Sequence, residues 1–355
     1  MSFFNRKKAF CDNISIQGYS HKKIDKECQD NSISWEGKGY CGIIVCDGHG
    51  GDKYIRSAIG SRLACEVGKE NISKFMEKYD FANTSKIDSA LDQLEKSIVS
   101  AWYSAVEADY SVDPVEEDER FTGLSDSDKE SLEKNPIKAY GSTFIAAVKT
   151  NDFCFVLKLG DGNTIFFYSD GSNEMPEELD DEGCQFNITT SLCNNDAAIS
   201  FHHCFRKFTK ERAVTGIVLT SDGVINCYKT EENYISFMQN VYFGYGEDDV
   251  ETAREDLRPA LEKLSEKGSG DDLSVAIIRD PLTDKDAELI KQKQEAYEAE
   301  KKAKEEEKSE TDGEEKNCPE GVSEECNIDK ESKGENEDNG EDSTFSGFFS
   351  FFRRF

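Results

Sequence analysis

Short apolar segments that meet an Asp beside a Gly or a second Asp recur along this chain, and they constrain its fold more than any other feature. The pairs are Asp47-Gly48, Asp161-Gly162, Asp222-Gly223 and Asp271-Asp272. Segments rich in Val, Ile, Phe and Tyr with turn residues at their ends are typical of β-strands. We therefore expect β-sheets whose ends carry carboxylates.

Six segments fit this strand pattern, and apolar residues at helical spacing lie between them. The predicted strands cover residues 39–45, 143–148, 153–159, 164–168, 216–220 and 273–278. Two long amphipathic helices are predicted, one through Ile55 and Val67 and one through Ile87 and Trp102, and a third over residues 250–267 despite Pro259. This order is not a regular βαβ alternation, so we expect mixed or antiparallel sheets faced by helices.

The composition changes after residue 282. Residues 1–282 alternate apolar segments and turns as one packed domain does, whereas residues 283–342 contain 23 acidic and 10 basic residues and almost no large apolar ones. Such a stretch cannot bury a core. Strong helix formers with opposite charges at spacing four predict an exposed charged helix over residues 283–308. Residues 309–342 are expected to be an acidic disordered linker.

The last segment, residues 343–355, reads STFSGFFSFFRRF. Its Phe residues recur at helical spacing beside Arg353 and Arg354, which predicts a docking segment for a hydrophobic groove or an anionic membrane surface. The alternatives are that it folds back onto the domain or stays disordered.

Charge and composition exclude several classes of protein. The 43 Lys and Arg against 73 Asp and Glu give a net charge of −30, and so acidic a chain is not expected to bind nucleic acid. The chain has no apolar run long enough for a membrane span or a signal peptide, so we expect a cytoplasmic monomer, peripheral at a membrane only through residues 343–355.

The twelve cysteines form no C-x-x-C pair and are expected to be buried packing residues. One of His202 and His203 is expected to pack inward, without zinc.

The acidic turns suggest chemistry when they are taken together. A single Asp-Gly pair is most simply a turn. Carboxylates at several strand ends, however, supply the oxygen ligands that Mg²⁺ and Mn²⁺ prefer. Two such ions bridged by one carboxylate activate water and clamp a transferring phosphoryl group. The pattern therefore predicts a phosphatase site.

Six elements carry a resemblance to a known family. They are Cys28-Gln29-Asp30, Asp47-Gly48-His49-Gly50-Gly51, Gly141-Ser142-Thr143, Gly160-Asp161, Ser221-Asp222-Gly223 and Asp271-Asp272. In order and spacing, over residues 12–280, the sequence resembles the metal-dependent serine/threonine protein phosphatases of type 2C. The resemblance implies an α+β fold, a four-layer αββα sandwich of two mostly antiparallel sheets flanked by helix pairs.

The resemblance also implies roles for individual residues around two Mg²⁺ or Mn²⁺ ions. The implied metal ligands are the bridging Asp47, the carbonyl of Gly48, Asp222, Asp271, Gln29 in place of a usual Glu, and Asp161 for an accessory third ion. Asp30 would hold metal-bound water, and His49 would protonate the leaving serine or threonine oxygen. The implied reaction is one-step hydrolysis of phosphoserine and phosphothreonine in phosphoprotein substrates by a metal-bound hydroxide.

Three positions depart from the family pattern. Gln29 should bind its ion more weakly than Glu. Asp25 stands where the family often has a phosphate-binding Arg, which leaves His21, Lys22, Lys23 or Lys26 for that task, with a solvated basic turn as the alternative. Asn226 replaces an expected Asp, so Asp161 is either a ligand of a third ion or only a turn residue.

These departures leave rival functions open. A catalytically weak or inactive pseudophosphatase that acts as a binding module keeps the fold without the chemistry, and a small-molecule phosphatase uses the same site. Residues 170–212 fall where the family places its variable flap, which we interpret as a substrate-selecting region.

Overall fold

The computed structural model describes residues 9–180, 189–209, 212–247 and 249–281, together with the single residues Glu288 and Gln292. The predicted docking segment lies outside the described residues, as do all but these two single residues of the predicted charged helix and linker. Part of the predicted flap, at residues 181–188 and 210–211, also lies outside them.

Within this part of the chain, ten strands form two five-stranded sheets with antiparallel pairing throughout. The first sheet has the order β1 (Phe10–Ile16), β10 (Leu273–Arg279), β9 (Val214–Thr220), β6 (Asn163–Tyr168) and β7 (Asn173–Glu174). The second has the order β2 (Asn31–Gly37), β3 (Tyr40–Cys46), β4 (Phe144–Thr150), β5 (Phe153–Leu159) and β8 (His202–Lys207).

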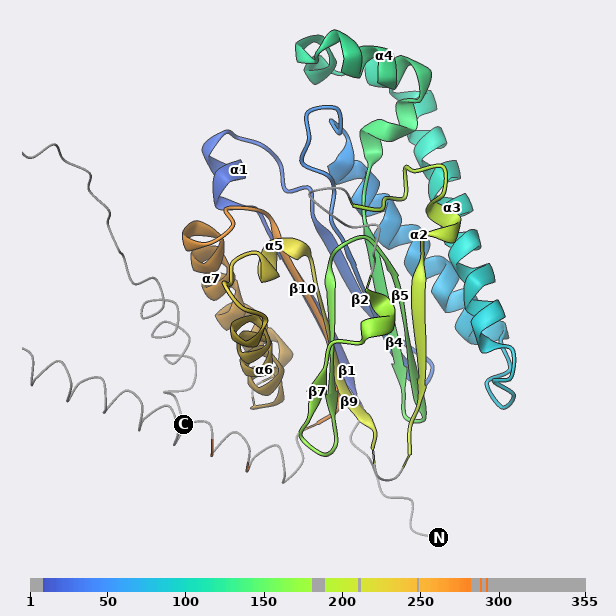
Figure 1. The fold of residues 1–355 in the computed structure, drawn as a ribbon, viewed down its shortest axis with the longest axis vertical. Coiled ribbons are helices and arrows are strands. Elements are labelled where there is room, and N and C mark those ends of the chain that lie inside the picture. The colour runs from blue at the N-terminus through green and yellow to red at the C-terminus, as the bar shows by residue number, and fades with distance from the viewer. Residues whose placement is uncertain are drawn as a thin grey trace, which may run out of the picture.

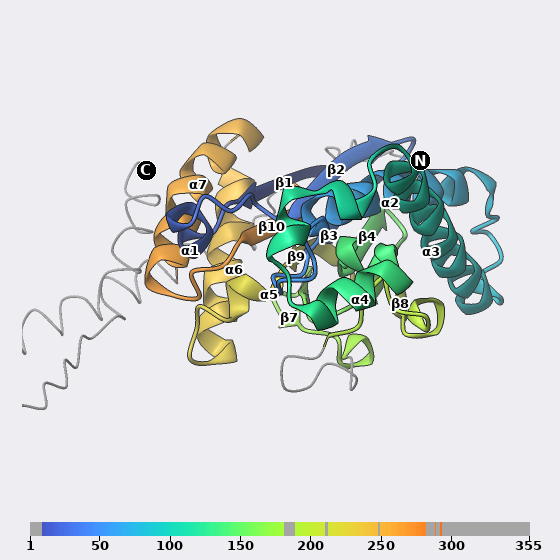
Figure 2. The ribbon, with the colours of Figure 1, turned by 90° about the horizontal axis from the view of Figure 1, so that it is seen from above.

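Helices cover the outer face of each sheet (Figures 1 and 2). The helices α2 (Ser57–Lys78) and α3 (Ile87–Val112) pack on the second sheet, and α6 (Glu231–Glu247) and α7 (Val250–Lys267) on the first. The shorter helices are α1 (Tyr19–Lys23), α4 (Asp126–Lys134) and α5 (Asp222–Ile225), with 3₁₀ turns η1 (Val115–Glu117), η2 (Glu119–Gly123), η3 (Pro136–Tyr140), η4 (Glu177–Leu179) and η5 (Ala197–Ile199). The αββα sandwich implied by the resemblance is confirmed.

Alternation along β3 shows how the strands build three apolar layers. Ile44 belongs to the cluster under α2 and α3, whereas its neighbours Ile43 and Val45 belong to the cluster between the two sheets. A third cluster, which includes Val218 of β9, lies under α6 and α7. Successive side chains of a strand point to opposite faces, so a strand that is apolar throughout is buried on both sides.

The six predicted strands correspond to β3, β4, β5, β6, β9 and β10, and the three predicted helices to α2, α3 and α7. The prediction lacks β1, β2 and β7, and it indicated β8 only through the alternation expected at His202 and His203. In β1, three polar residues interrupt the apolar pattern. Asn13 and Ser15 bond to Ser32 of β2, and Asp12 accepts hydrogen bonds from Tyr245 and Arg254. Six of the nine described cysteines are buried and all nine are free, as their packing role requires. Among the described helices, none combines the length and the apolar character needed to cross a membrane.

Candidate active site

The acidic strand ends meet at one end of the sandwich. Asn31 of β2 pairs with Cys46 of β3, so Gln29-Asp30 and Asp47 lie at the same end of the second sheet. Val275 of β10 pairs with Thr220 of β9, which places Asp271 and Asp222 together at one end of the first sheet. Ser221 Oγ joins the two ends by donating a hydrogen bond to Asp30 Oδ2 at 2.7 Å. The antiparallel registers therefore bring together carboxylates that are up to 241 residues apart in the sequence.

Four of these carboxylates repel one another. Burial raises the pKa of Asp47 well above its usual value, and the charges of Asp30, Asp222 and Asp271 raise it further. Burial, followed by the charge of Asp272, raises the pKa of Asp30 to about 8 even though Ser221 donates to it. Burial and the charge of Asp222 raise the pKa of Asp271 too. Nearby cationic charge is what would allow the whole set to ionise.

Asp272 has a different role from its neighbour Asp271. Its carboxylate accepts hydrogen bonds from the N–H groups of Gly18 and Gln29, both at 2.6 Å, and its Oδ1 lies 2.9 Å from His21 Nδ1. Burial raises the pKa of Asp272, but the bonds from His21, Gly18 and Gln29 outweigh it and the net pKa is lowered. Asp272 thus stays charged and ties together the segments that precede β2, β10 and α1.

Gln29 presents an oxygen without a protein partner. Its side chain is buried, and its Nε2 donates to the carbonyl of His49 at 3.0 Å and to the hydroxyl of Ser57. Its Oε1 is buried and makes no hydrogen bond. A buried amide oxygen that is left unbonded costs free energy unless another group binds it, and a cation is one such group. Gly48 packs against the backbone of Gln29. A Cβ at position 48 would come within 2.6 Å of the backbone carbonyl oxygen of Gln29.

His49 is held by the segment that precedes β4. Its N–H donates to the carbonyl of Gly141 at 3.1 Å, and its ring lies edge-on to Tyr54 with 4.8 Å between centroids. A Cβ at position 141 would lie 2.6 Å from the His49 ring, so this contact requires Gly. Burial, assisted by the positive charge of Lys53, lowers the pKa of His49 to about 4. The imidazole is therefore neutral at pH 7, which weighs against an imidazolium proton donor in this state, and the role of leaving-group acid stays a prediction.

Asp161 lies near Asp222. Burial raises the pKa of Asp161, with a further contribution from the Asp222 charge. Asn226 Nδ2 donates a hydrogen bond to Asp222 Oδ2 at 2.9 Å. The amide of Asn226 therefore stabilises the Asp222 carboxylate, where a second carboxylate would repel it.

The two residues predicted to bind phosphate are engaged elsewhere. His21 Nδ1 pairs with Asp272, its Nε2 lies 3.9 Å from Asp271, and Lys22 Nζ lies 3.4 Å from Glu262 of α7. Asp25, at the position of the family's Arg, has a left-handed φ of 55°, which Asp tolerates better than most residues. The assignment of His21 and Lys22 as phosphate ligands stays a prediction.

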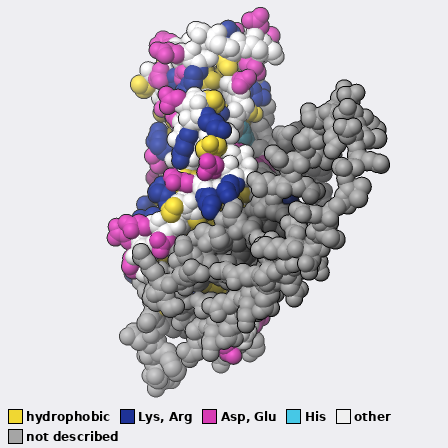
Figure 3. Space-filling model, turned by 90° about the vertical axis from the view of Figure 1, so that its left-hand side faces the viewer, with side chains coloured by type: hydrophobic (Ala, Val, Ile, Leu, Met, Phe, Trp, Pro, Cys, Tyr) yellow, Lys and Arg dark blue, Asp and Glu magenta, His cyan; other side chains and the backbone are white. Residues whose placement is uncertain are grey.

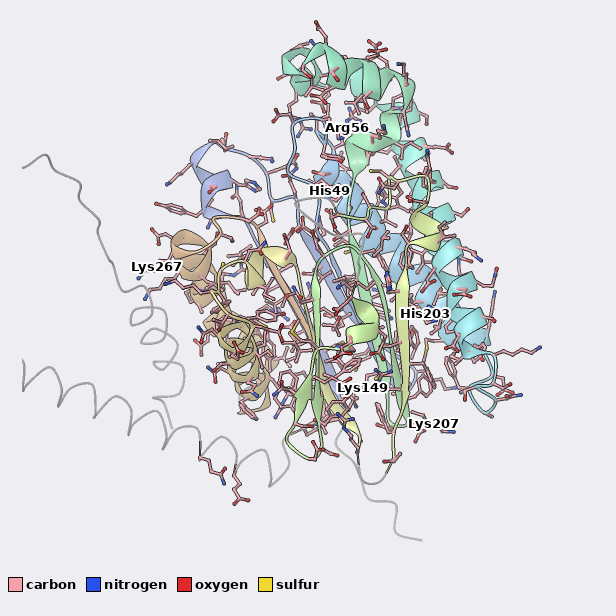
Figure 4. The ribbon with its side chains drawn as sticks, viewed as in Figure 1. His49, Arg56, Lys149, His203, Lys207 and Lys267 are labelled. Carbon is pink, nitrogen blue, oxygen red and sulfur yellow. The ribbon has the colours of Figure 1, made fainter. Side chains whose placement is uncertain are left out.

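Sequence reasoning missed Arg56, which lies next to the segment that holds His49. Its side chain is 2% exposed and forms ion pairs with Asp113 at 3.0 Å, Asp118 at 3.3 Å and Asp109 at 3.6 Å. Its backbone N–H donates to Ala139, two residues before the Gly141 that holds His49. Figure 4 places Arg56 above His49. Asp109 and Asp113 stand at helical spacing, but they lie more than 50 residues from Arg56 in the sequence, so no local pattern linked them to it.

Comparisons with known proteins identify the family to which the sequence belongs. The sequence matches the family model described as protein phosphatase 2C over residues 17–263. A point variant of a bacterial serine phosphatase has a TM-score of 0.50 at 13% sequence identity, covering 78% of this chain and 99% of that chain. Stp1, a serine/threonine phosphatase from Staphylococcus aureus, has a TM-score of 0.47 at 13% identity, covering 77% and 96%. The catalytic domain of the serine/threonine phosphatase PstP, in complex with two manganese ions, has a TM-score of 0.46 at 15% identity, covering 77% and 99%. No curated protein matches the sequence.

Proposed function

Because this chain belongs to the protein phosphatase 2C family, a family of metal-dependent protein phosphatases, we propose that it hydrolyses phosphoserine and phosphothreonine in proteins with two Mg²⁺ or Mn²⁺ ions. The observation that carries the proposal is the convergence of Asp30, Asp47, Asp222 and Asp271 at one end of the sandwich. A scaffold without chemistry has no need for carboxylates that raise one another's pKa.

The residues of the site fit divalent cations. Their carboxylates repel one another, and the buried Oε1 of Gln29 lacks a partner. The ligands that would hold the ions are Asp47, Asp222, Asp271, the Gly48 carbonyl and Gln29, with Asp161 as a candidate for a further ion. When bound, the cations would supply positive charge for the phosphoryl oxygens and lower the pKa of a coordinated water.

Two further residues of the chain are assigned roles in the reaction. Asp30, oriented by the Ser221 hydroxyl, would accept a hydrogen bond from the attacking water. His49, held by Gly141 and Tyr54, would give a proton to the leaving serine or threonine oxygen. That second role needs a higher pKa than the one His49 has here, and a phosphate dianion bound beside the imidazole would raise it.

Hydrolysis of para-nitrophenyl phosphate and of phosphoserine peptides tests the proposal. We expect turnover that needs Mn²⁺ or Mg²⁺, stops in EDTA, and falls at least about a hundredfold in Asp47→Asn because the central carboxylate is lost. Asp152→Asn is the matched control, since Asp152 lies exposed in the turn between β4 and β5, away from the acidic end. Wild-type protein without metal-dependent turnover would contradict the proposal.

The rival function is a pseudophosphatase that binds partners, and Gln29, Asp25 and Asn226 favour it. It predicts peptide binding without turnover. A small-molecule phosphatase instead predicts that soluble phosphate esters are hydrolysed in preference to phosphopeptides. Measuring both substrate classes side by side separates the three functions.

The remaining sequence predictions are carried forward as proposals. Residues 343–355 would dock into a hydrophobic groove or onto an anionic membrane surface, and the protein would be a cytoplasmic monomer. Liposome and pulldown binding of the full chain and of a chain lacking residues 343–355 tests the docking segment, and equal binding by both would exclude it.

A further inference from the structure

Three lysines lie near the loop that carries His49, although the chain as a whole has a net charge of −30. Lys26 Nζ donates to the carbonyl of Gly50 at 3.0 Å. Lys53 Nζ lies 4.9 Å from the Tyr54 ring centroid, and that ring contacts His49. Lys138 lies in η3, three residues before Gly141. Its backbone carbonyl accepts a hydrogen bond from the N–H of Gly141. We call Lys26, Lys53 and Lys138 the lysine rim.

The lysine rim is not neutralised by the described acidic residues. None of its three ammonium groups has a described carboxylate within ion-pair distance, whereas the nearby Lys22 pairs with Glu262 and Arg120 pairs with Glu27 and Asp118. Figure 3 shows basic side chains interspersed with acidic ones on the described part of one face of the molecule. The rim is therefore a group of three lysines near an acidic site that form no described ion pair, and Lys138 Nζ instead lies 3.5 Å from the Ser131 hydroxyl.

The three lysines approach the site through different neighbours. Burial raises the pKa of the Cys193 thiol, and the positive charges of Lys53 and Lys138 oppose that rise, so both ammonium groups lie near this thiol. Lys26 lies over Gly50, where the nearest atoms to an added Cβ would be Lys26 Nζ and Gln29 Oε1. A peptide that brings a phosphorylated residue to the acidic cluster would pass beside these lysines.

We propose that the lysine rim binds acidic side chains, Asp or Glu, that flank the phosphorylated residue of a protein substrate. The inference rests on the proposed phosphatase function and adds a substrate class to it. Acidic flanks would be repelled by most of this molecule, so unpaired lysines beside the reacting group are needed for their binding. Lys is a flexible point charge without the fixed fork of Arg, and it can meet carboxylates at varied positions.

Fluorescence anisotropy with labelled phosphoserine peptides, in EDTA so that hydrolysis does not interfere, tests the rim directly. The peptides carry Asp, Asn or Lys on either side of the phosphoserine. We expect wild-type protein to bind the Asp-flanked peptide more tightly than the Asn-flanked one, with the advantage falling as salt rises. In Lys53→Gln/Lys138→Gln that advantage should shrink about fivefold, since each exposed charge pair contributes modestly. Lys207→Gln is the control, because Lys207 lies on β8 far from His49 (Figure 4).

The ratio of kcat/KM for the Asp-flanked and Asn-flanked peptides, measured with Mn²⁺, gives a second reading of the same preference. A wild-type protein that binds both peptides equally, or a double variant that keeps the full preference, would overturn the inference even if turnover is normal. Absence of turnover with a preserved, rim-dependent binding preference would instead overturn the phosphatase function and leave the lysine rim standing as a binding surface for acidic peptides.

Discussion

At the scale of single residues, the two atoms of the Gln29 amide have different roles. The amide nitrogen donates a hydrogen bond to the carbonyl of His49. The amide oxygen is buried and has no hydrogen-bond partner. A Glu at this position would gain a negative charge at the site, but it would lose the donor and bring a second oxygen against the His49 carbonyl.

We therefore predict that Gln29→Glu lowers the stability of the metal-free protein and raises its affinity for Mn²⁺. Without metal, the free energy of unfolding should fall by about 1–3 kcal/mol, because a hydrogen bond is replaced by two facing acceptors. With Mn²⁺, affinity should rise by roughly tenfold, because a carboxylate is a stronger ligand for a hard cation than an amide. Urea unfolding in EDTA and titration calorimetry with Mn²⁺ measure the two effects. Gln17→Glu serves as control, since the Gln17 amide binds the Lys26 carbonyl outside the cluster. Weaker Mn²⁺ binding by Gln29→Glu would contradict the assignment of Gln29 as a ligand.

The acidic members of the site were accessible from sequence, whereas their supporting contacts were not. Asp47, Asp222 and Asp271 follow or precede apolar segments, so their place at strand ends could be predicted. The separate role of Asp272 could not, because it depends on N–H groups of Gly18 and Gln29 that only the register of β1, β2 and β10 brings near. The neutral state of His49 likewise depends on burial beneath Tyr54 and Gly141.

At the scale of elements, Arg56 joins the start of α2 to the end of α3. It pairs with Asp109 in α3, with Asp113 at its C-cap and with Asp118 before η2, and it donates to the Tyr140 hydroxyl at 3.1 Å. Tyr140 in turn donates to Asp109 at 2.7 Å. The helix pair on the second sheet is thus fixed at the end where the site lies.

We predict that Arg56→Met lowers the free energy of unfolding by about 1–3 kcal/mol, because the partly buried Asp109 and Asp118 carboxylates and the Tyr140 hydroxyl lose a charged donor. Urea unfolding at neutral pH measures this. Arg62→Met, one and a half turns along α2, should change it by less than about 0.5 kcal/mol, since the Arg62–Glu66 pair is exposed. Equal, small effects of the two substitutions would show that the Arg56 cluster does not stabilise the fold.

A second link between elements joins α3 to the edge strand β8. His203 Nδ1 lies 2.8 Å from the buried Glu95, with Asp92 at 3.9 Å and Asp88 also near. The hydrogen bond to Glu95, outweighing burial and aided by the charges of Asp92 and Asp88, raises the pKa of His203. Because the pKa of His203 is higher in the folded than in the unfolded protein, the protonated side chain stabilises the fold. This stabilisation is fully present below the unfolded-state pKa of about 6.5 and is lost as pH rises through the folded-state pKa.

Wild-type stability should therefore fall more steeply than that of His203→Gln as pH rises from about 6.5 through the folded pKa. Urea unfolding at several pH values measures the difference in slope. His202→Gln, on the opposite face of β8, is the control and should keep the wild-type slope. A His203→Gln slope equal to that of wild type would show that the pair does not titrate in this range.

The elements themselves divide into those with a strong sequence signal and those without one. Strands such as β4 and β5 lie in the middle of the second sheet, are buried on both faces and read as continuous apolar segments, so they could be predicted. In contrast, β1 and β2 face each other through Asn13, Ser15 and Ser32, which bond between the sheets and leave no apolar run. The contact between these two strands of different sheets is made by polar groups 17–19 residues apart, which no local pattern reveals.

At the scale of the whole molecule, the apolar clusters formed by the described residues reach no further than Ile278. The cluster between the sheets extends to Ile278 of β10, and the clusters under the two helix pairs end earlier in the chain. The 23 acidic and 10 basic residues of 283–342 contribute repulsion but add no large apolar surface. The energy that holds the sandwich together is therefore expected to come from residues before Pro281.

We predict that a chain ending at Pro281 keeps the melting temperature of the full chain to within about 2 °C, because none of its apolar clusters is cut. Its Mn²⁺-dependent hydrolysis of para-nitrophenyl phosphate should also equal that of the full chain, since every proposed ligand is retained. Circular dichroism melting and steady-state rates measure both. The contrasting truncation ends at Lys267 and removes β10, whose loss takes a central strand of the first sheet along with Asp271 and should abolish cooperative melting. If the chain ending at Pro281 melts more than about 5 °C lower, a difference of roughly 1 kcal/mol or more, then residues after 281 pack against the domain and the boundary at 282 is wrong.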